Sequence, residues 1–203
     1  MVILLTGVSC VGKTSVGGAL AELLGVPFVD LDNEVERQLG APIERLQQRC
    51  GSMDVFRSQA AKVLMTILGS LNGQSCVIAL PPSGMLGAYW RVVKQHPSVT
   101  VVLEDVPESI LERINFFDAD SHPIQKKLTP RERTLYLREI RKDIDYFARS
   151  YRKADLHVDI STCAIDEAAA RVRDALPNPA HLDKVTKGSP NTSVQVAPLP
   201  RRT

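Results

Sequence analysis

The chain has 203 residues, of which 44% are hydrophobic and 24% are charged, and this balance fits one globular domain with a full core. The formal net charge is only +2 and its positive surplus lies in residues 177–203, which excludes the concentrated basic face of a nucleic-acid binder. Four cysteines without a CxxC pair, an apolar start without a basic leader and the lack of a long apolar run predict free thiols, a cytoplasmic location and no membrane partner.

Short apolar runs and helical patterns alternate along the first half of the chain. The apolar run 1–6 is typical of a buried parallel strand, and Gly25 ends a helix predicted over 13–24. A second strand is expected over 26–31. Helical segments follow over 34–39 and 55–71, with breaks at 40–42 and near Gly51 between them.

The second half of the chain continues this alternation. A third strand over 76–80 ends at Pro81 and Pro82, and a helix over 88–95 leads into a fourth strand over 99–103. A helix is expected over 107–114 and a polar loop over 118–130. Thr129 and Glu132 form a capping box around Pro130, which starts a helix running to 153. A fifth strand over 156–160 and a helix over 165–176 follow.

This order of elements predicts an α/β fold in three layers, with a five-stranded parallel sheet between helices. The predicted domain covers residues 1–176. Residues 177–203 hold five of the 13 prolines and show no periodic apolar face, so a disordered tail is expected there. We expect a monomer.

The strongest motif is Gly7-Val-Ser-Cys-Val-Gly-Lys-Thr14, which fits the phosphate-binding pattern GxxxxGK[ST] between a strand and a helix. Glycines let backbone amides turn toward phosphate oxygens, and the helix that follows adds its positive end. Lys13 is expected to reach the β- and γ-phosphates of ATP and Thr14 to bind Mg²⁺. The predicted nucleotide-binding residues are Gly7, Ser9, Cys10, Val11, Gly12, Lys13, Thr14 and Ser15.

Two carboxylates, Asp30 and Asp32, are placed at the carboxyl end of the second strand, beside this loop. Ligands of parallel sheets gather at that edge, and residues two apart on a strand point the same way. Two carboxylates facing a triphosphate favour a bound Mg²⁺, with one of them accepting a proton from an incoming hydroxyl. The pair could equally belong to the surface, with Asp32 capping the next helix.

Over residues 1–175 the chain resembles the shikimate kinase family. The segment 28–37, FVDLDNEVER, is similar to that family's F-x-D-x-D-x-x-I-E signature, which implies a magnesium role for Asp30 and makes Asp32 the base that binds a shikimate hydroxyl. Phe56 and Arg57 resemble the family's Phe-Arg pair, whose arginine binds the substrate carboxylate. A solvated arginine near the start of a helix is the alternative for Arg57. The resemblance also implies an acceptor-binding insert over 33–70 and a mobile lid over 115–133.

The chain departs from the family pattern mainly on the acceptor side. The family's GGG after the third strand is replaced by two prolines followed by Ser83 and Gly84, and only these last two could offer amide hydrogens. The lid arginine corresponds to His122, and Arg149 is a candidate for the arginine expected before the last strand. The basic residues that could replace the lid arginine are Lys126, Lys127, Arg131 and Arg133.

These residues predict a P-loop kinase that transfers the γ-phosphoryl group of ATP, with Mg²⁺, to a hydroxyl of a small hydroxy acid, with shikimate as the first candidate. Lys13, Asp32 and Arg57 are the predicted catalytic residues. The predicted substrate-binding residues are Asp32, Arg57, Ser83, Gly84 and Arg149. The alternatives are a related kinase for another sugar acid, a nucleoside or an antibiotic, and a nucleotide-binding protein without catalysis.

Overall fold

Five parallel strands form the central sheet of the computed structural model, which describes residues 1–117, 123–124 and 127–177. The strand order is β2-β3-β1-β4-β7, and its neighbouring strands are parallel, which confirms the predicted five-stranded parallel sheet. The strands span Val2–Thr6 (β1), Phe28–Asp30 (β2), Cys76–Ala79 (β3), Ser98–Glu104 (β4) and Leu156–Asp159 (β7). Every residue of the central strand β1 is buried, which explains its unbroken apolar sequence.

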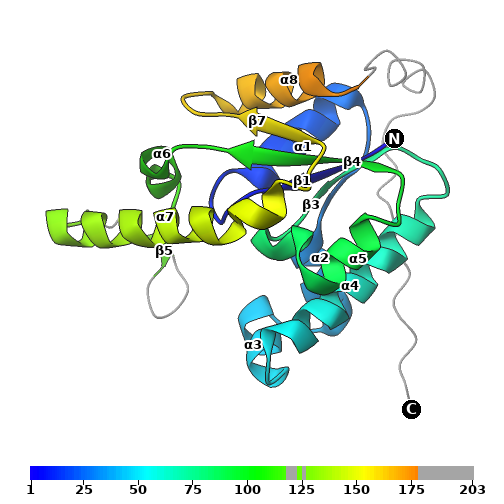
Figure 1. Ribbon diagram of the computed structural model, residues 1–203, viewed down its shortest axis with the longest axis horizontal. Helices are drawn as coiled ribbons and strands as arrows, with labels where there is room; N and C mark the ends of the chain where they lie inside the picture. Colours follow the sequence, from blue (N-terminus) through cyan, green and yellow to red (C-terminus); the bar gives the residue numbers. More distant parts are fainter. Residues whose placement is uncertain (118–122, 125–126, 178–203) are drawn as a thin grey trace.

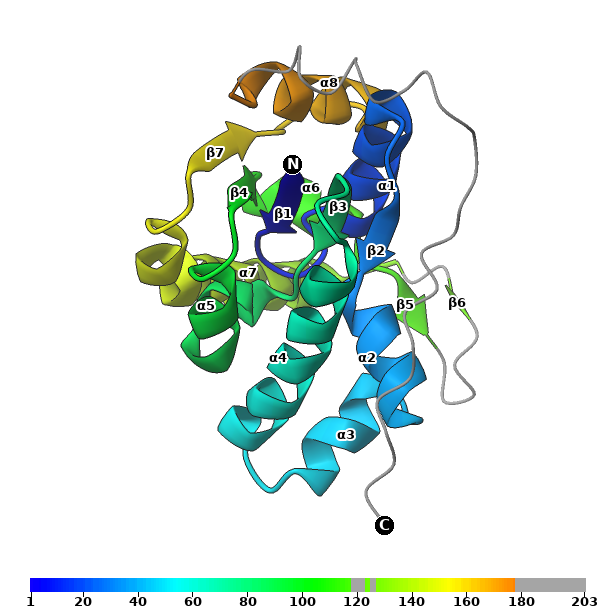
Figure 2. The same cartoon turned by 90° about the vertical axis from the view of Figure 1, so that its right-hand side faces the viewer.

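Helices cover both faces of this sheet and complete the predicted three layers (Figure 1; Figure 2). Helices α1 (Lys13–Leu24) and α8 (Ile165–Ala175) pack against each other on one face. Helices α4 (Met53–Ser70), α5 (Gly87–Val93) and α7 (Pro130–Tyr151) lie on the other, and α6 (Pro107–Glu112) packs against α7. Among the described residues, no helix combines the length and apolar content that a bilayer crossing needs.

Residues 33–70, for which we expect a role in acceptor binding, lie in three helices. Helix α2 (Leu31–Leu39) and α3 (Ile43–Arg49) lie with α4 at one end of the molecule, away from α8 (Figure 2). Gly40, with φ of 71°, ends α2, and Ser52 caps α4 by accepting a hydrogen bond from the amide of Val55. The predicted breaks between these helices are therefore confirmed.

Three local predictions were wrong or incomplete. The second strand ends at Asp30, because its carboxylate caps α2 by accepting a hydrogen bond from the Asp32 amide at 3.0 Å, and Asp32 thus lies in the first helical turn. The prolines after β3 lead into a short 3₁₀ helix, η1 (Pro82–Met85). The predicted loop over 118–130 contains the short strand β6 (Pro123–Ile124), which pairs antiparallel with β5 (Phe116–Phe117) just before the loop.

Parts of two predicted segments lie outside the described residues. Within the expected lid over 115–133, these are 118–122 and 125–126, which include His122 and Lys126. Of the expected tail over 177–203, all but residue 177 lie outside.

Candidate functional site

The phosphate-binding loop connects the buried strand β1 to helix α1. At Gly7, φ is 147° and a Cβ atom would lie 2.7 Å from the carbonyl oxygen of Leu103, so only glycine fits. Gly12, with φ of 110°, precedes the helix and leaves its first turn without a side-chain cap or an acidic residue. The free amides and the positive end of α1 therefore remain available to an anion.

Lys13 stands at the start of α1 with its ammonium group turned back onto the loop. Its Nζ donates to the carbonyl oxygens of Gly7 at 3.0 Å and Val8 at 2.9 Å. Burial lowers the pKa of Lys13 to about 8, against the opposing influence of Asp32, Cys10 and Asp30. At neutral pH this ammonium is therefore charged, which suits it to a phosphate.

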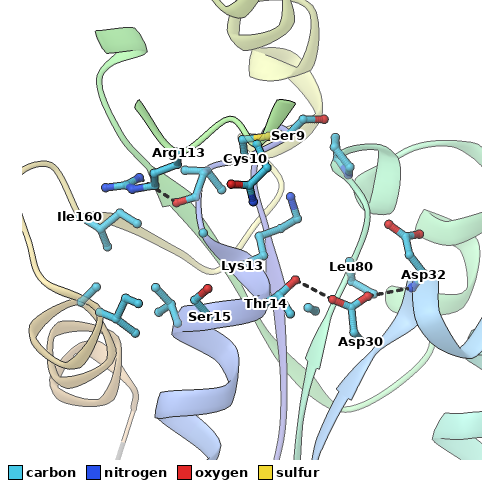
Figure 3. A pocket seen from close by; sticks show the side chains of 18 of the residues that line it. Ser9, Cys10, Lys13, Thr14, Ser15, Asp30, Asp32, Leu80, Arg113 and Ile160 are labelled. Atoms are coloured by element: carbon cyan, nitrogen blue, oxygen red, sulfur yellow. Dashed lines mark hydrogen bonds between the residues drawn. The ribbon is translucent and has the colours of Figure 1, made fainter. Parts of the chain in front are cut away.

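Thr14 and Asp30 place two oxygen atoms side by side across the loop and the end of β2 (Figure 3). The Thr14 hydroxyl donates to Oδ2 of Asp30 at 2.7 Å, while Oδ1 accepts from the amide of Asp32. A hydroxyl and a carboxylate are the hard donors that Mg²⁺ prefers, usually one or two per protein site, with substrate phosphates completing the shell. The donor set at Thr14 and Asp30 thus fits that ion.

Asp32 carries the perturbed carboxyl group of the site. Burial, and then repulsion from Asp30, raise the pKa of Asp32 to about 6, although Lys13 opposes this. Glu36 and Glu44 raise it further. A carboxylate with a pKa near 6 is a stronger base than an ordinary aspartate and is still ionised at neutral pH, which suits proton transfer from a hydroxyl.

A cavity of about 640 Å³ brings most of the predicted nucleotide residues together with both aspartates. The predicted residues that line it are Ser9, Cys10, Val11, Gly12, Lys13, Thr14, Ser15, Asp30 and Asp32. Gly7, the first residue of the loop, does not line the cavity. One wall comes from the chain after β7, at residues 160–168.

Arg113 is a lining residue that sequence reasoning missed (Figure 3). It directly follows α6 and donates from Nη1 to the carbonyl oxygen of Val11 at 3.1 Å, and it pairs with the buried carboxylate of Asp105 at 2.5 Å. Its guanidinium therefore steadies the phosphate loop and adds positive charge to the cavity. Because Val11 is 102 residues away, no local pattern reveals this contact.

Of the predicted substrate-binding residues, Asp32 lines this cavity, whereas Arg57, Ser83, Gly84 and Arg149 do not. Arg57, on α4, is only 16% exposed and pairs with Asp54 at 3.2 Å. Ser83 and Gly84 lie in η1, where the Gly84 amide donates to the carbonyl oxygen of Pro81 at 2.8 Å. That amide is committed to the turn, so the prediction that it faces the substrate does not fit this geometry.

Gly84 also has a packing role. A Cβ atom there would lie 2.7 Å from the Cβ atom of Leu80, so the turn needs a glycine at this position. Arg149 is exposed in the last turn of α7 and lines no part of the cavity. Its role in substrate binding stays a prediction.

A model of the shikimate kinase family matches residues 9–176, which is most of the chain and includes residues 9–14 of the phosphate loop and both aspartates. The chain belongs to the shikimate kinase family. A shikimate kinase from Cereibacter sphaeroides is 30% identical over 174 residues, covering 86% of this chain and 81% of that protein.

Solved shikimate kinase structures share the fold. One from Bacteroides thetaiotaomicron aligns with a TM-score of 0.69 at 22% identity, covering 86% of this chain and 97% of that one. Another, from Acinetobacter baumannii in complex with shikimate, aligns with a TM-score of 0.64 at 25% identity, covering 92% and 94%. The predicted P-loop kinase fold and the resemblance to this family are confirmed, and with them the assignment as an ATP-dependent kinase.

Proposed function

We propose that this member of the shikimate kinase family transfers the γ-phosphoryl group of ATP to a hydroxyl group of shikimate. The observation that carries the proposal is the convergence of Lys13, the Thr14–Asp30 pair and the perturbed carboxyl of Asp32 on one cavity. Phosphoryl transfer requires positioning and charge stabilisation more than covalent chemistry, and these groups supply both.

On the nucleotide side, the loop amides and the first turn of α1 bind the phosphates. The ammonium of Lys13 exchanges the carbonyls of Gly7 and Val8 for β- and γ-phosphate oxygens, and Arg113 adds a second cation. Mg²⁺, held by Thr14 and Asp30, would supply neutralisation of the charge that develops on the transferring group. These residues therefore favour the transition state by electrostatics.

On the acceptor side, Asp32 positions the attacking hydroxyl and accepts its proton. Arg57 binds the acceptor carboxylate through its guanidinium, in exchange for the exposed carboxylate of Asp54. We assign residues 33–70 to acceptor binding and residues 115–133 to a lid, within a kinase domain over 1–176. A lid would exclude water from the transfer and limit hydrolysis.

A second candidate is a kinase for another small hydroxy acid. The observation that favours it is the turn after β3, where the two prolines have no amide hydrogen and the Gly84 amide is already bonded. The acceptor pocket of this chain therefore offers fewer backbone donors than the glycine-rich turn that the family pattern predicts.

ADP formation with ATP, Mg²⁺ and shikimate tests the proposal, beside a panel of cyclic and linear hydroxy acids. We expect acceptor-stimulated ADP release with shikimate, which the Asp32→Asn variant lowers by about 100-fold or more, as loss of a general base does. Higher kcat/KM for another acid would favour the second candidate. Tight ATP binding without stimulation by any acceptor would contradict both.

A further inference from the structure

Tyr89 has a buried hydroxyl group that the packing of the core does not explain. Its side chain, on α5, is 0% exposed, and its Oη atom has no hydrogen-bond partner among the residues that the structure describes. Leaving a buried hydroxyl unpaired costs free energy, and native proteins rarely do so without a reason. A phenyl ring would fill the same volume without that cost.

Tyr151 shows how a buried tyrosine in this chain is otherwise accommodated. It is 6% exposed, its ring stacks on Phe147, and its hydroxyl donates to the carbonyl oxygen of Pro82 at 3.0 Å. The hydroxyl of Tyr151 therefore holds the turn after β3 in place. Tyr89 makes no such structural bond within the described residues.

Tyr89 belongs to the same packed group of helices as the two charged groups assigned to acceptor binding. Helix α4, which carries Arg57, packs against both α5, which carries Tyr89, and α2, which carries Asp32 (Figure 2). In agreement with this arrangement, burial raises the pKa of Tyr89, the carboxylate of Asp32 raises it further and the guanidinium of Arg57 lowers it. Tyr89 is therefore within electrostatic range of both groups.

Arg57 presents a second unpaired donor in the same region. Its Nε atom is buried and has no partner within the described part of the chain, although its Nη1 atom pairs with Asp54. A hydroxyl can accept one hydrogen bond and donate another at the same time. One group can thus satisfy Arg57 and still donate to Asp32.

We propose that Tyr89 is a positioning residue that links Arg57 to Asp32 when the acceptor binds. Its oxygen accepts from the Nε atom of Arg57, and its proton is donated to the carboxylate of Asp32. The inference rests on the proposed function. The Tyr89 hydroxyl fixes the distance between Arg57, which binds the acceptor carboxylate, and Asp32, which binds the acceptor hydroxyl. The inference predicts selectivity for acids in which these two acceptor groups match that distance.

Steady-state kinetics of Tyr89→Phe with ATP, Mg²⁺ and shikimate tests the inference. We expect KM for the acceptor to rise about tenfold while KM for ATP stays within twofold, since the change does not touch the nucleotide side. Tyr146→Phe, at a 64% exposed tyrosine, is the control and leaves both constants unchanged. An unchanged acceptor KM in Tyr89→Phe would overturn the inference.

A double-mutant cycle with Arg57→Lys, which removes the Nε donor, tests the link itself. If Tyr89 acts through Arg57, the loss from Tyr89→Phe shrinks to less than threefold in the Arg57→Lys background. Two losses that multiply in full would contradict the link. Should wild type prefer another acid of the panel, shikimate fails as the acceptor and the same cycle is run with the preferred acid. Wild type without turnover of any acid would overturn both proposals.

Urea unfolding distinguishes this role from a structural one. Because Tyr89 loses no hydrogen bond in the free protein, Tyr89→Phe is expected to unfold at the same urea concentration as wild type or at a higher one. Tyr151→Phe, which loses its bond to Pro82, is expected to unfold at a lower concentration. Equal destabilisation by both variants would show that the Tyr89 hydroxyl has a structural partner and would overturn the inference.

Discussion

Replacing Asp32 by Asn should make the free protein more stable while removing its activity. In the folded protein the carboxyl of Asp32 is partly buried beside Asp30, and its pKa is raised from 3.8 to about 6. At pH 7 the folded state therefore carries a negative charge on Asp32 that burial and the charge of Asp30 destabilise. An asparagine of the same shape carries no such charge.

The size of the effect follows from the pKa. Each pH unit between 3.8 and about 6 corresponds to about 1.4 kcal/mol, which gives about 3 kcal/mol in total. Because the side chain is partly exposed, we expect about 2 kcal/mol to be measured. The folded state holds the proton more tightly than the unfolded chain, so wild type loses this stability as pH rises through that window and the variant does not.

Urea unfolding followed by circular dichroism, without nucleotide and with EDTA, measures the difference. We expect wild type and Asp32→Asn to have similar unfolding free energies at pH 4 and to differ by about 2 kcal/mol at pH 7, with the variant the more stable. The reasoning about this carboxyl group would be refuted if the variant were less stable than wild type at pH 7. It would also be refuted if the variant exceeded wild type in unfolding free energy by the same amount at both pH values.

Three further predictions concern the phosphate loop and its support. Lys13→Met should abolish ATP binding in calorimetry. The variant should also change how stability depends on pH. Because folding lowers the pKa of Lys13 from 10.5 to about 8, between these pH values the unfolded chain keeps a proton on Lys13 that the folded protein has lost. Wild-type stability should therefore rise relative to that of the variant between pH 8 and 10.5, and parallel profiles would contradict this. Arg113→Met should destabilise the protein by about 3 kcal/mol, because it leaves the buried carboxylate of Asp105 without its ion-pair partner. The same variant should raise KM for ATP. Adding Asp105→Asn should restore stability but not ATP affinity, and recovery of both would argue against a nucleotide role. On α1, a Cβ atom at Gly17 would lie 2.6 Å from the Phe28 ring, whereas one at Gly18 meets nothing within 4 Å. Gly17→Ala should therefore be less stable than Gly18→Ala by at least about 1 kcal/mol in urea unfolding, and equal values would contradict the close packing.

Elements with local signals were predictable from the sequence. The capping box at Thr129 and Glu132 sets the start of α7 because both hydrogen bonds form within one turn. The phosphate loop was equally predictable, since its glycines, Lys13 and Thr14 lie close together in the sequence. The same locality could have revealed that Asp30 caps α2, but the apolar run before it suggested that the strand continued.

Features that depend on distant contacts were not predictable. Arg113 reaches Val11 across 102 residues, and Tyr89 comes within electrostatic range of Asp32 and Arg57 only through the packing of α2, α4 and α5. The prolines after β3 indicated a turn, but its 3₁₀ geometry, which uses the Gly84 amide, depends on packing against Leu80. The residues on the nucleotide side can therefore be predicted from the sequence, whereas those on the acceptor side come together only through tertiary packing.

Phosphorus NMR of a reaction containing the protein, ATP, Mg²⁺ and shikimate tests the central claim most directly. The account predicts a new phosphomonoester signal that grows in step with ADP and is absent with Asp32→Asn. ADP accompanied only by inorganic phosphate, at a rate independent of shikimate, would contradict it.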